Sequence, residues 1–102
     1  MKEMRYYMSK LLESPSAEQI LFDNGYENVV IFKNPNYDTA LIGVSEDNRA
    51  VYSYDKMVEY LMEYEGMSED DACDFICSDT IRSLPYVEGA PIVVYELMQT
   101  IN

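Results

Sequence analysis

The stretch "GMSEDDACDFICSD", residues 66–79, brings several carboxylates and two thiols together in one short segment. Carboxylates are ligands for calcium and thiolates are ligands for zinc, so the segment raises the question of a metal site. A calcium-binding EF-hand loop needs a glycine at its sixth position to allow a sharp turn. Counting from Glu69, the sixth residue is Asp74, and the segment therefore does not predict a calcium loop.

The two cysteines, Cys73 and Cys77, are four positions apart, which can place both thiols on one face of a helix. A structural zinc site would need two more ligands, and the chain has no histidine and no third cysteine. The spacing also differs from the Cys-x-x-Cys motif of redox enzymes, and a disulfide across one helical turn would be strained. We therefore expect no metal and no cofactor, and we interpret both thiols as the edge of the core.

The aspartates of this segment form a more informative pattern. On a helical wheel Asp70, Asp71 and Asp74 share one polar arc, opposite the apolar residues. Like charges four positions apart destabilise a helix slightly, so helix stability does not explain them. Glu59 and Glu63 repeat the pattern on the preceding predicted helix, and a helix hairpin would merge both groups into one acidic surface. Two interpretations stay open: a solvated acidic face, or a contact surface for a basic partner protein.

Catalytic chemistry has little support in the sequence. Paired carboxylates can serve glycoside hydrolysis, but such sites are usually larger and more aromatic, and this chain has no tryptophan. Its glycines are isolated, so it has no phosphate-binding loop or nucleophile elbow, and without histidine it has no Ser-His pair. We expect no catalytic residue and no enzyme activity.

Tyrosines are unusually frequent, ten against three phenylalanines. Tyrosine combines apolar area with a polar tip and is enriched at protein interfaces. Tyr37, in an Asn/Pro/Asp loop, and Tyr60, among acidic residues on a helix, are predicted to be exposed partner contacts. Tyr52 and Tyr54 should share one face of a strand, where half-buried packing and partner contact are both open alternatives.

The elements that position these residues follow from capping signals and from the hydrophobic period. In chain order the sequence predicts helices over 3–13 and 16–22, strands over 28–32, 39–45 and 50–54, helices over 55–65 and 68–79, and a strand over 91–95. Ser16, Asp55 and Ser68 are the predicted N-caps, and Gly66 ends the helix before the last of them. Gly43 interrupts its strand at a bulge or at a close backbone approach.

These elements predict one domain, residues 1–102, of the α+β class, with the order ααβββααβ. We expect a small antiparallel sheet, a three-strand meander plus a C-terminal strand, with helices packed on one face. The residues of the helix over 55–65 that are expected to face the core are Met57, Val58, Leu61, Met62 and Tyr64.

The net charge of −12 bears on the class of partner. A domain this acidic repels nucleic acid and anionic lipid, so we expect no direct binding to nucleic acid or to membranes. Its long-range attraction is toward basic surfaces. Two cysteines do not make a disulfide framework, and no apolar segment reaches the length that spans a membrane, so we expect a cytoplasmic protein.

The segments "ALIGVS", "VYSYDKMVEYL", "GMSEDDACDFI" and "DTIRSLPY" fall within residues 37–86. In wording and order they resemble small acidic proteins of gut Firmicutes and of their phages and mobile elements. Asp71-Ala72 and Asp79-Thr80 stand where that pattern usually has Glu-Ala and Asn-Thr. The resemblance implies a cytoplasmic setting in a bacterial host cell and attaches no activity.

The leading hypothesis is a non-enzymatic acidic protein that binds a basic partner protein. Its sharper form is an anti-defence inhibitor, such as an anti-CRISPR protein, that occupies the nucleic-acid channel of a host nuclease or effector with carboxylates in place of phosphates. The alternative is a regulatory or adaptor protein that uses tyrosine-rich contacts. The predicted partner-binding residues are Glu59, Tyr60, Glu63, Asp70, Asp71, Asp74 and Tyr37.

Overall fold

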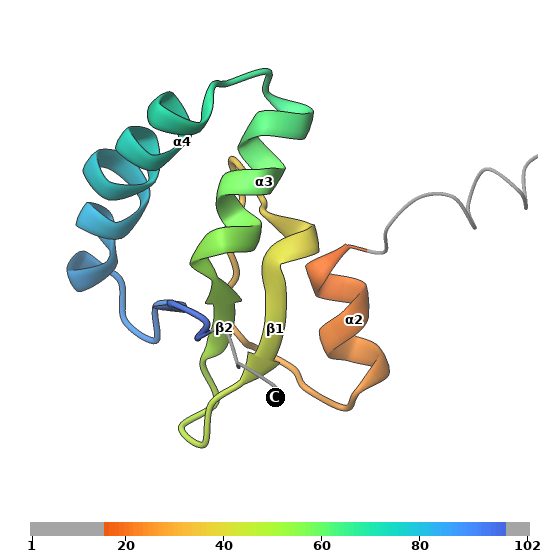
Figure 1. Cartoon of the computed structure of the whole chain (residues 1–102). Coiled ribbons are helices and arrows are strands. Elements are labelled where there is room, and N and C mark those ends of the chain that lie inside the picture. The colour runs from red at the N-terminus through yellow and green to blue at the C-terminus, as the bar shows by residue number, and fades with distance from the viewer. Residues whose placement is uncertain (1–15, 98–102) are drawn as a thin grey trace, which may run out of the picture.

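The computed structural model of the chain describes residues 16–97, and the helix predicted over 3–13 lies outside them (Figure 1). The elements are α2 (Ala17–Asp23), the 3-10 turn η1 (Asp38–Ala40), β1 (Leu41–Val44), β2 (Ala50–Ser53), α3 (Tyr54–Tyr64), α4 (Glu69–Phe75), the π-helix η2 (Ile76–Ile81), the 3-10 turn η3 (Leu84–Tyr86) and β3 (Ile92–Val94). The fold is α+β, as predicted. None of the helices within residues 16–97 has the length and apolar character needed to cross a membrane.

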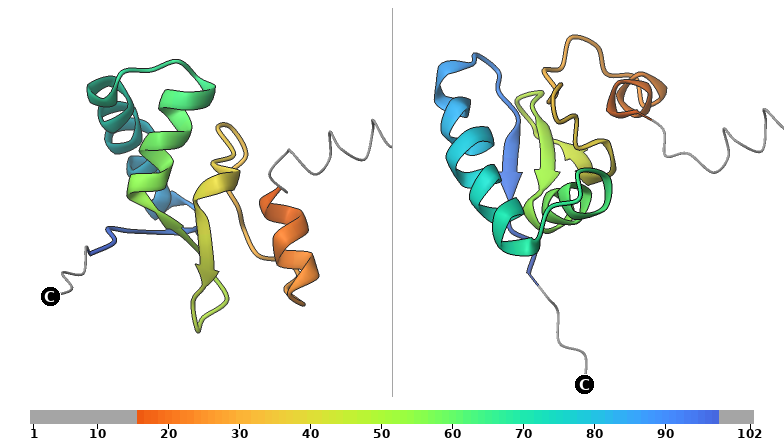
Figure 2. Two further views of the ribbon diagram at one scale, coloured as in Figure 1. Left: turned by 45° about the vertical axis from the view of Figure 1, so that its right-hand side comes forward. Right: turned by 90° about the horizontal axis from the view of Figure 1, so that it is seen from above.

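The sheet is mixed, with the strand order β1-β2-β3. β1 and β2 form an antiparallel hairpin, but β2 and β3 run parallel, so the expectation of an all-antiparallel sheet was wrong. Parallel neighbours need a long crossover, and α3, α4 and η2 provide it between β2 and β3. The helices α3 and α4 lie together, whereas α2 lies beside β1 on the other side of the molecule (Figures 1 and 2).

The apolar run over residues 28–32 is not a strand, in contrast to the prediction. Val29, Ile31 and Phe32 instead pack against the core, and the backbone N–H of Phe32 donates a hydrogen bond to the hydroxyl of Tyr52 at 3.3 Å. β-branched and aromatic residues fit a half-buried surface, yet a strand also needs a free backbone edge to pair with. In the described part of the chain the sheet leaves only the outer edges of β1 and β3 without a partner strand, and residues 28–32 pair with neither of them.

Serine caps begin α2 and α4 as predicted. The hydroxyl of Ser16 accepts a hydrogen bond from the backbone N–H of Gln19 at 3.1 Å, and that of Ser68 accepts one from the N–H of Asp71 at 3.1 Å. Each bond satisfies one of the N–H groups that the first helical turn leaves without a partner. Ser16 and Ser68, which the sequence indicates as N-caps, therefore mark the starts of α2 and α4.

The ends of α3 differ slightly from the prediction. Ser53, two residues before the predicted Asp55, is the N-cap and accepts a hydrogen bond from the N–H of Lys56 at 3.3 Å. The same hydroxyl donates to the carboxylate of Glu96 at 2.6 Å, which ties the start of α3 to the segment after β3. Gly66 follows the helix with φ of +70°, a conformation that a side chain disfavours.

Replacing Ser68 by alanine should lower the free energy of unfolding by about 1 kcal/mol, because the N–H of Asp71 loses its acceptor. Ser68→Asp keeps an acceptor oxygen and should recover most of this loss. Urea denaturation of the three proteins measures the effect. Equal midpoints for the alanine variant and the wild type would show that the cap does not stabilise α4.

The core lies between α3, α4 with η2, and the sheet. Its buried residues are Tyr37, Ala40, Ala50, Tyr52, Met57, Val58, Leu61, Ala72 and Ile76. On α3 the prediction holds for Met57, Val58 and Leu61, but Met62 is 43% and Tyr64 is 55% exposed. The buried arc of α3 is rotated relative to the prediction because Tyr60 turns inward and packs on another aromatic ring.

The helix predicted over 68–79 is continuous, but its second half is a π-helix. In a regular α-helix every fourth residue drifts around the axis by about 40°. The wider π turn reverses this drift, so that Ala72, Ile76 and Thr80 all remain buried at successive four-residue steps. The π-helix therefore brings the hydroxyl of Thr80 into the core.

Candidate functional site

The predicted helix hairpin is present. α3 and α4 pack against each other and are joined by a short turn that contains Gly66 (Figure 1). The predicted acidic residues of both helices are exposed, and we call them the acidic hairpin: Glu59, Glu63, Asp70, Asp71 and Asp74. Their helices turn apolar residues inward, so the local amphipathic pattern leaves these carboxylates in solvent.

Basic residues flank the stretch of sequence that holds these carboxylates but do not occur within it: Lys56 precedes Glu59 by three positions, and Arg82 follows the π-helix. The sequence has no lysine or arginine between Met57 and Ile81. Within residues 16–97 the one ion pair joins Asp47 and Arg49 at 3.8 Å, in the hairpin between β1 and β2. Within the same range the carboxylates of α3 and α4 form no ion pair, so they repel one another. Their negative charge can attract a cation from outside the chain.

Tyr37, a predicted partner contact, is fully buried, and this prediction was wrong. Its hydroxyl lies 2.8 Å from the hydroxyl of Thr80, and its ring packs edge-on against Phe32 with centroids 5.3 Å apart. The neighbouring polar side chains satisfy backbone groups: the N–H of Asp38 donates to Asn36 at 3.1 Å. Asn36 thus stabilises the turn by a hydrogen bond to the backbone, while the ring of Tyr37 packs in the core.

Tyr60 is half-buried and is the middle ring of a series that runs from the core to the surface. Its ring centroid is 5.6 Å from that of Tyr37 and 4.8 Å from that of Tyr64. Burial raises the pKa of Tyr60, and the carboxylates of Asp38 and Glu65 raise it further. Tyr64, which the helical period placed on the core side of α3, is 55% exposed.

The two cysteines lie near a second tyrosine pair. Cys73 is half-buried and Cys77 is exposed. Hydrogen bonding to Cys73 raises the pKa of Tyr54, whose ring packs on that of Tyr95 with centroids 4.7 Å apart. Within the described part of the chain, no group of three histidine, cysteine or acidic side chains is arranged to hold a metal ion.

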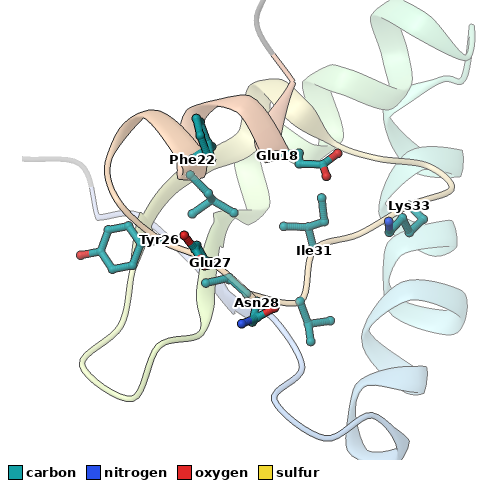
Figure 3. Close-up of a pocket in the computed structure, with 10 residues that line it drawn as sticks. Glu18, Phe22, Tyr26, Glu27, Asn28, Ile31 and Lys33 are labelled. Carbon is teal, nitrogen blue, oxygen red and sulfur yellow. The ribbon is translucent and has the colours of Figure 1, made fainter.

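A hollow of about 450 Å³ lies between α2 and the segment that follows it (Figure 3). Its lining is mainly apolar, with Glu18, Glu27 and Lys33 as its charged side chains. The residues predicted to bind a partner do not line it. This hollow is therefore a feature separate from the acidic hairpin.

Alkaline pH should destabilise the fold through Tyr52, because burial raises its pKa to about 12. The unfolded value is near 10, so the folded state holds the proton more tightly. This contribution, about 2–3 kcal/mol, is fully present below about pH 10 and is lost as the pH rises through about 12. Urea denaturation at a series of alkaline pH values should show a steeper loss for the wild type than for Tyr52→Phe. Identical pH dependence of both proteins would contradict this origin.

Comparison with known proteins gave no matching family, no similar curated protein and no similar solved structure.

Proposed function

We propose that the chain is a non-enzymatic acidic interaction protein whose acidic hairpin binds a basic surface of a partner protein. The observation that carries this proposal is the set of exposed carboxylates on two adjacent helices, none of which forms an ion pair within the described residues. Opposite charge on a partner would relieve their mutual repulsion and would steer the encounter of the two proteins.

The sharper form of the proposal is an inhibitor that imitates nucleic acid. Proteins that bind DNA or RNA carry basic channels that accept rows of phosphates. The carboxylates of Asp70, Asp71 and Asp74, together with those of α3, would occupy such a channel in place of phosphates. The resemblance to phage and mobile-element proteins directs this idea toward a host defence nuclease or effector, the target class of anti-CRISPR proteins, in the bacterial cytoplasm.

A regulatory or adaptor role is the second candidate, and exposed aromatic rings favour it. Tyr86 is 87% and Tyr95 is 61% exposed, and neither belongs to the acidic hairpin. Tyrosines of this kind form protein contacts that depend little on salt. An adaptor should therefore lose binding through Tyr86→Ala or Tyr95→Ala and should keep it when carboxylates of the acidic hairpin are neutralised.

Affinity capture with the full chain from a bacterial lysate, with and without added DNA or RNA, tests the proposal. We expect the captured protein to bind nucleic acid by itself, and we expect added nucleic acid to release it. Binding of the purified partner is then measured with the same competitor. A partner that stays bound in excess nucleic acid would contradict the mimic and would favour the adaptor.

A further inference from the structure

We propose that Tyr60 and Tyr64 form an arginine-recognition point beside the acidic hairpin, where a guanidinium group of the partner stacks on the exposed ring of Tyr64. This inference rests on the proposed function, since it names the basic side chain that the partner presents.

The rings are held in place from the core outward. Tyr37 is fully buried and hydrogen-bonded to Thr80, and Tyr60 packs on it with an interplanar angle of 55°. Tyr64 packs in turn on Tyr60, with centroids 4.8 Å apart and an angle of 41°. Each ring is supported by the one beneath it, so the outermost ring loses little conformational entropy when a partner stacks on it.

Acidic groups lie around this ring pair. Glu65 directly follows Tyr64 in the sequence, and Asp38 belongs to η1, which packs against α3. Burial raises the pKa of Tyr60, and the two carboxylates raise it further. Within residues 16–97 neither carboxylate forms an ion pair. A cation on Tyr64 would therefore be attracted by the ring face and by nearby negative charge at once.

Arginine fits this surface better than other side chains do. Its planar, weakly hydrated guanidinium stacks on an aromatic face and donates in-plane hydrogen bonds to a carboxylate, whereas the lysine ammonium is a strongly hydrated point charge. A purely apolar side chain would remove the surrounding carboxylates from water without pairing them. A second copy of this chain also carries a net charge of −12, so the two copies would repel each other.

Two peptides of equal length test the inference, one with arginines and one with lysines at the same positions among glycines and serines. Their affinity for the full chain is measured at low salt. We expect the arginine peptide to bind about fivefold tighter than the lysine peptide. Tyr64→Ala and Tyr64→Leu should each remove this preference by weakening the arginine peptide more than the lysine peptide, whereas Tyr64→Phe should keep it. Tyr86→Ala, at an exposed tyrosine on η3, is the matched control and should also keep it.

The outcomes separate the inference from the proposal on which it rests. Equal affinity of the wild type for both peptides, with binding that weakens in salt, would overturn arginine recognition and leave the acidic interaction protein standing. A preference that survives in both Tyr64→Ala and Tyr64→Leu would also overturn it. Binding of neither peptide would overturn both ideas.

Discussion

Replacing Tyr37 by alanine is expected to lower the free energy of unfolding by about 3–5 kcal/mol, the usual cost of removing a large aromatic ring from a core. Tyr37 is fully buried, packs against Phe32 and Tyr60, and holds the hydroxyl of Thr80. A loss of this size is a large part of the total stability of a small domain. Urea or thermal denaturation, followed by circular dichroism, measures it.

Three control proteins isolate the causes of this loss. Tyr37→Phe keeps the ring and leaves the Thr80 hydroxyl without its partner, so it should cost about 1–2 kcal/mol. Adding Thr80→Val to Tyr37→Phe should cost less than the two single changes together, because the unpaired hydroxyl is removed. Tyr86→Ala removes an exposed ring and should leave stability unchanged. If Tyr37→Ala is as stable as the wild type, Tyr37 does not pack in the core, and the prediction of an exposed Tyr37 would be right.

Neutralising Asp70, Asp71 and Asp74 together as asparagines is expected to weaken binding to the proposed basic partner about 10- to 100-fold. Each exposed charge pair contributes up to about 1 kcal/mol, and three such losses give a factor of this size. The shape of α4 should persist, because the asparagines have almost the same volume and because the repulsion between Asp70 and Asp74 is removed. Titration of the purified partner, monitored by calorimetry, measures the change.

A matched triple variant keeps the same net charge and moves the neutralised positions elsewhere. Glu18, Glu46 and Glu88 are exposed on other parts of the chain, and their replacement by glutamine also removes three negative charges. We expect this control to bind nearly as well as the wild type. Equal weakening by both triple variants would mean that total charge, and not the acidic hairpin, governs the association.

The parts of the fold with local chemical signals could be predicted. The caps at Ser16 and Ser68 each need one side-chain oxygen and a backbone N–H three residues ahead. The end of α3 needs one residue, Gly66, in a left-handed conformation. The bulge is local as well: the pairing of β1 with β2 shifts between Leu41 and Gly43. A side chain at Gly43 would meet open space, so the bulge explains this glycine and a close backbone approach does not.

Features that depend on distant partners could not be predicted. Residues 28–32 have the composition of a strand, but a strand forms only where the backbone pairs with a sheet edge, and these residues pair with neither outer edge of the sheet. The parallel direction of β3 depends on the crossover as a whole. The π-helix keeps Thr80 in the core beside Tyr37, and this contact joins residues far apart in the sequence.

In the candidate site, the acidic residues have a local signal in the sequence and the tyrosines do not. The exposure of Glu59, Glu63 and the three aspartates follows from helical period, so it was predictable. The tyrosines were harder, because a tyrosine fits a core and a surface equally well. Tyr37 and Tyr64 exchanged the roles assigned to them: the loop residue is buried, and the helix residue is exposed. Only the packing of Tyr60 between them decides this.

The salt dependence of the affinity for the proposed partner shows most directly whether the acidic hairpin binds through its charges. Charges on the acidic hairpin act through water and are screened as salt increases, whereas apolar and tyrosine contacts are not. We predict that the affinity falls at least about tenfold between roughly 50 and 200 mM salt, and that the variant with asparagines at 70, 71 and 74 shows a shallower dependence. An affinity that stays constant over this range, for the wild type and the variant alike, would show that the acidic hairpin does not bind through its charges.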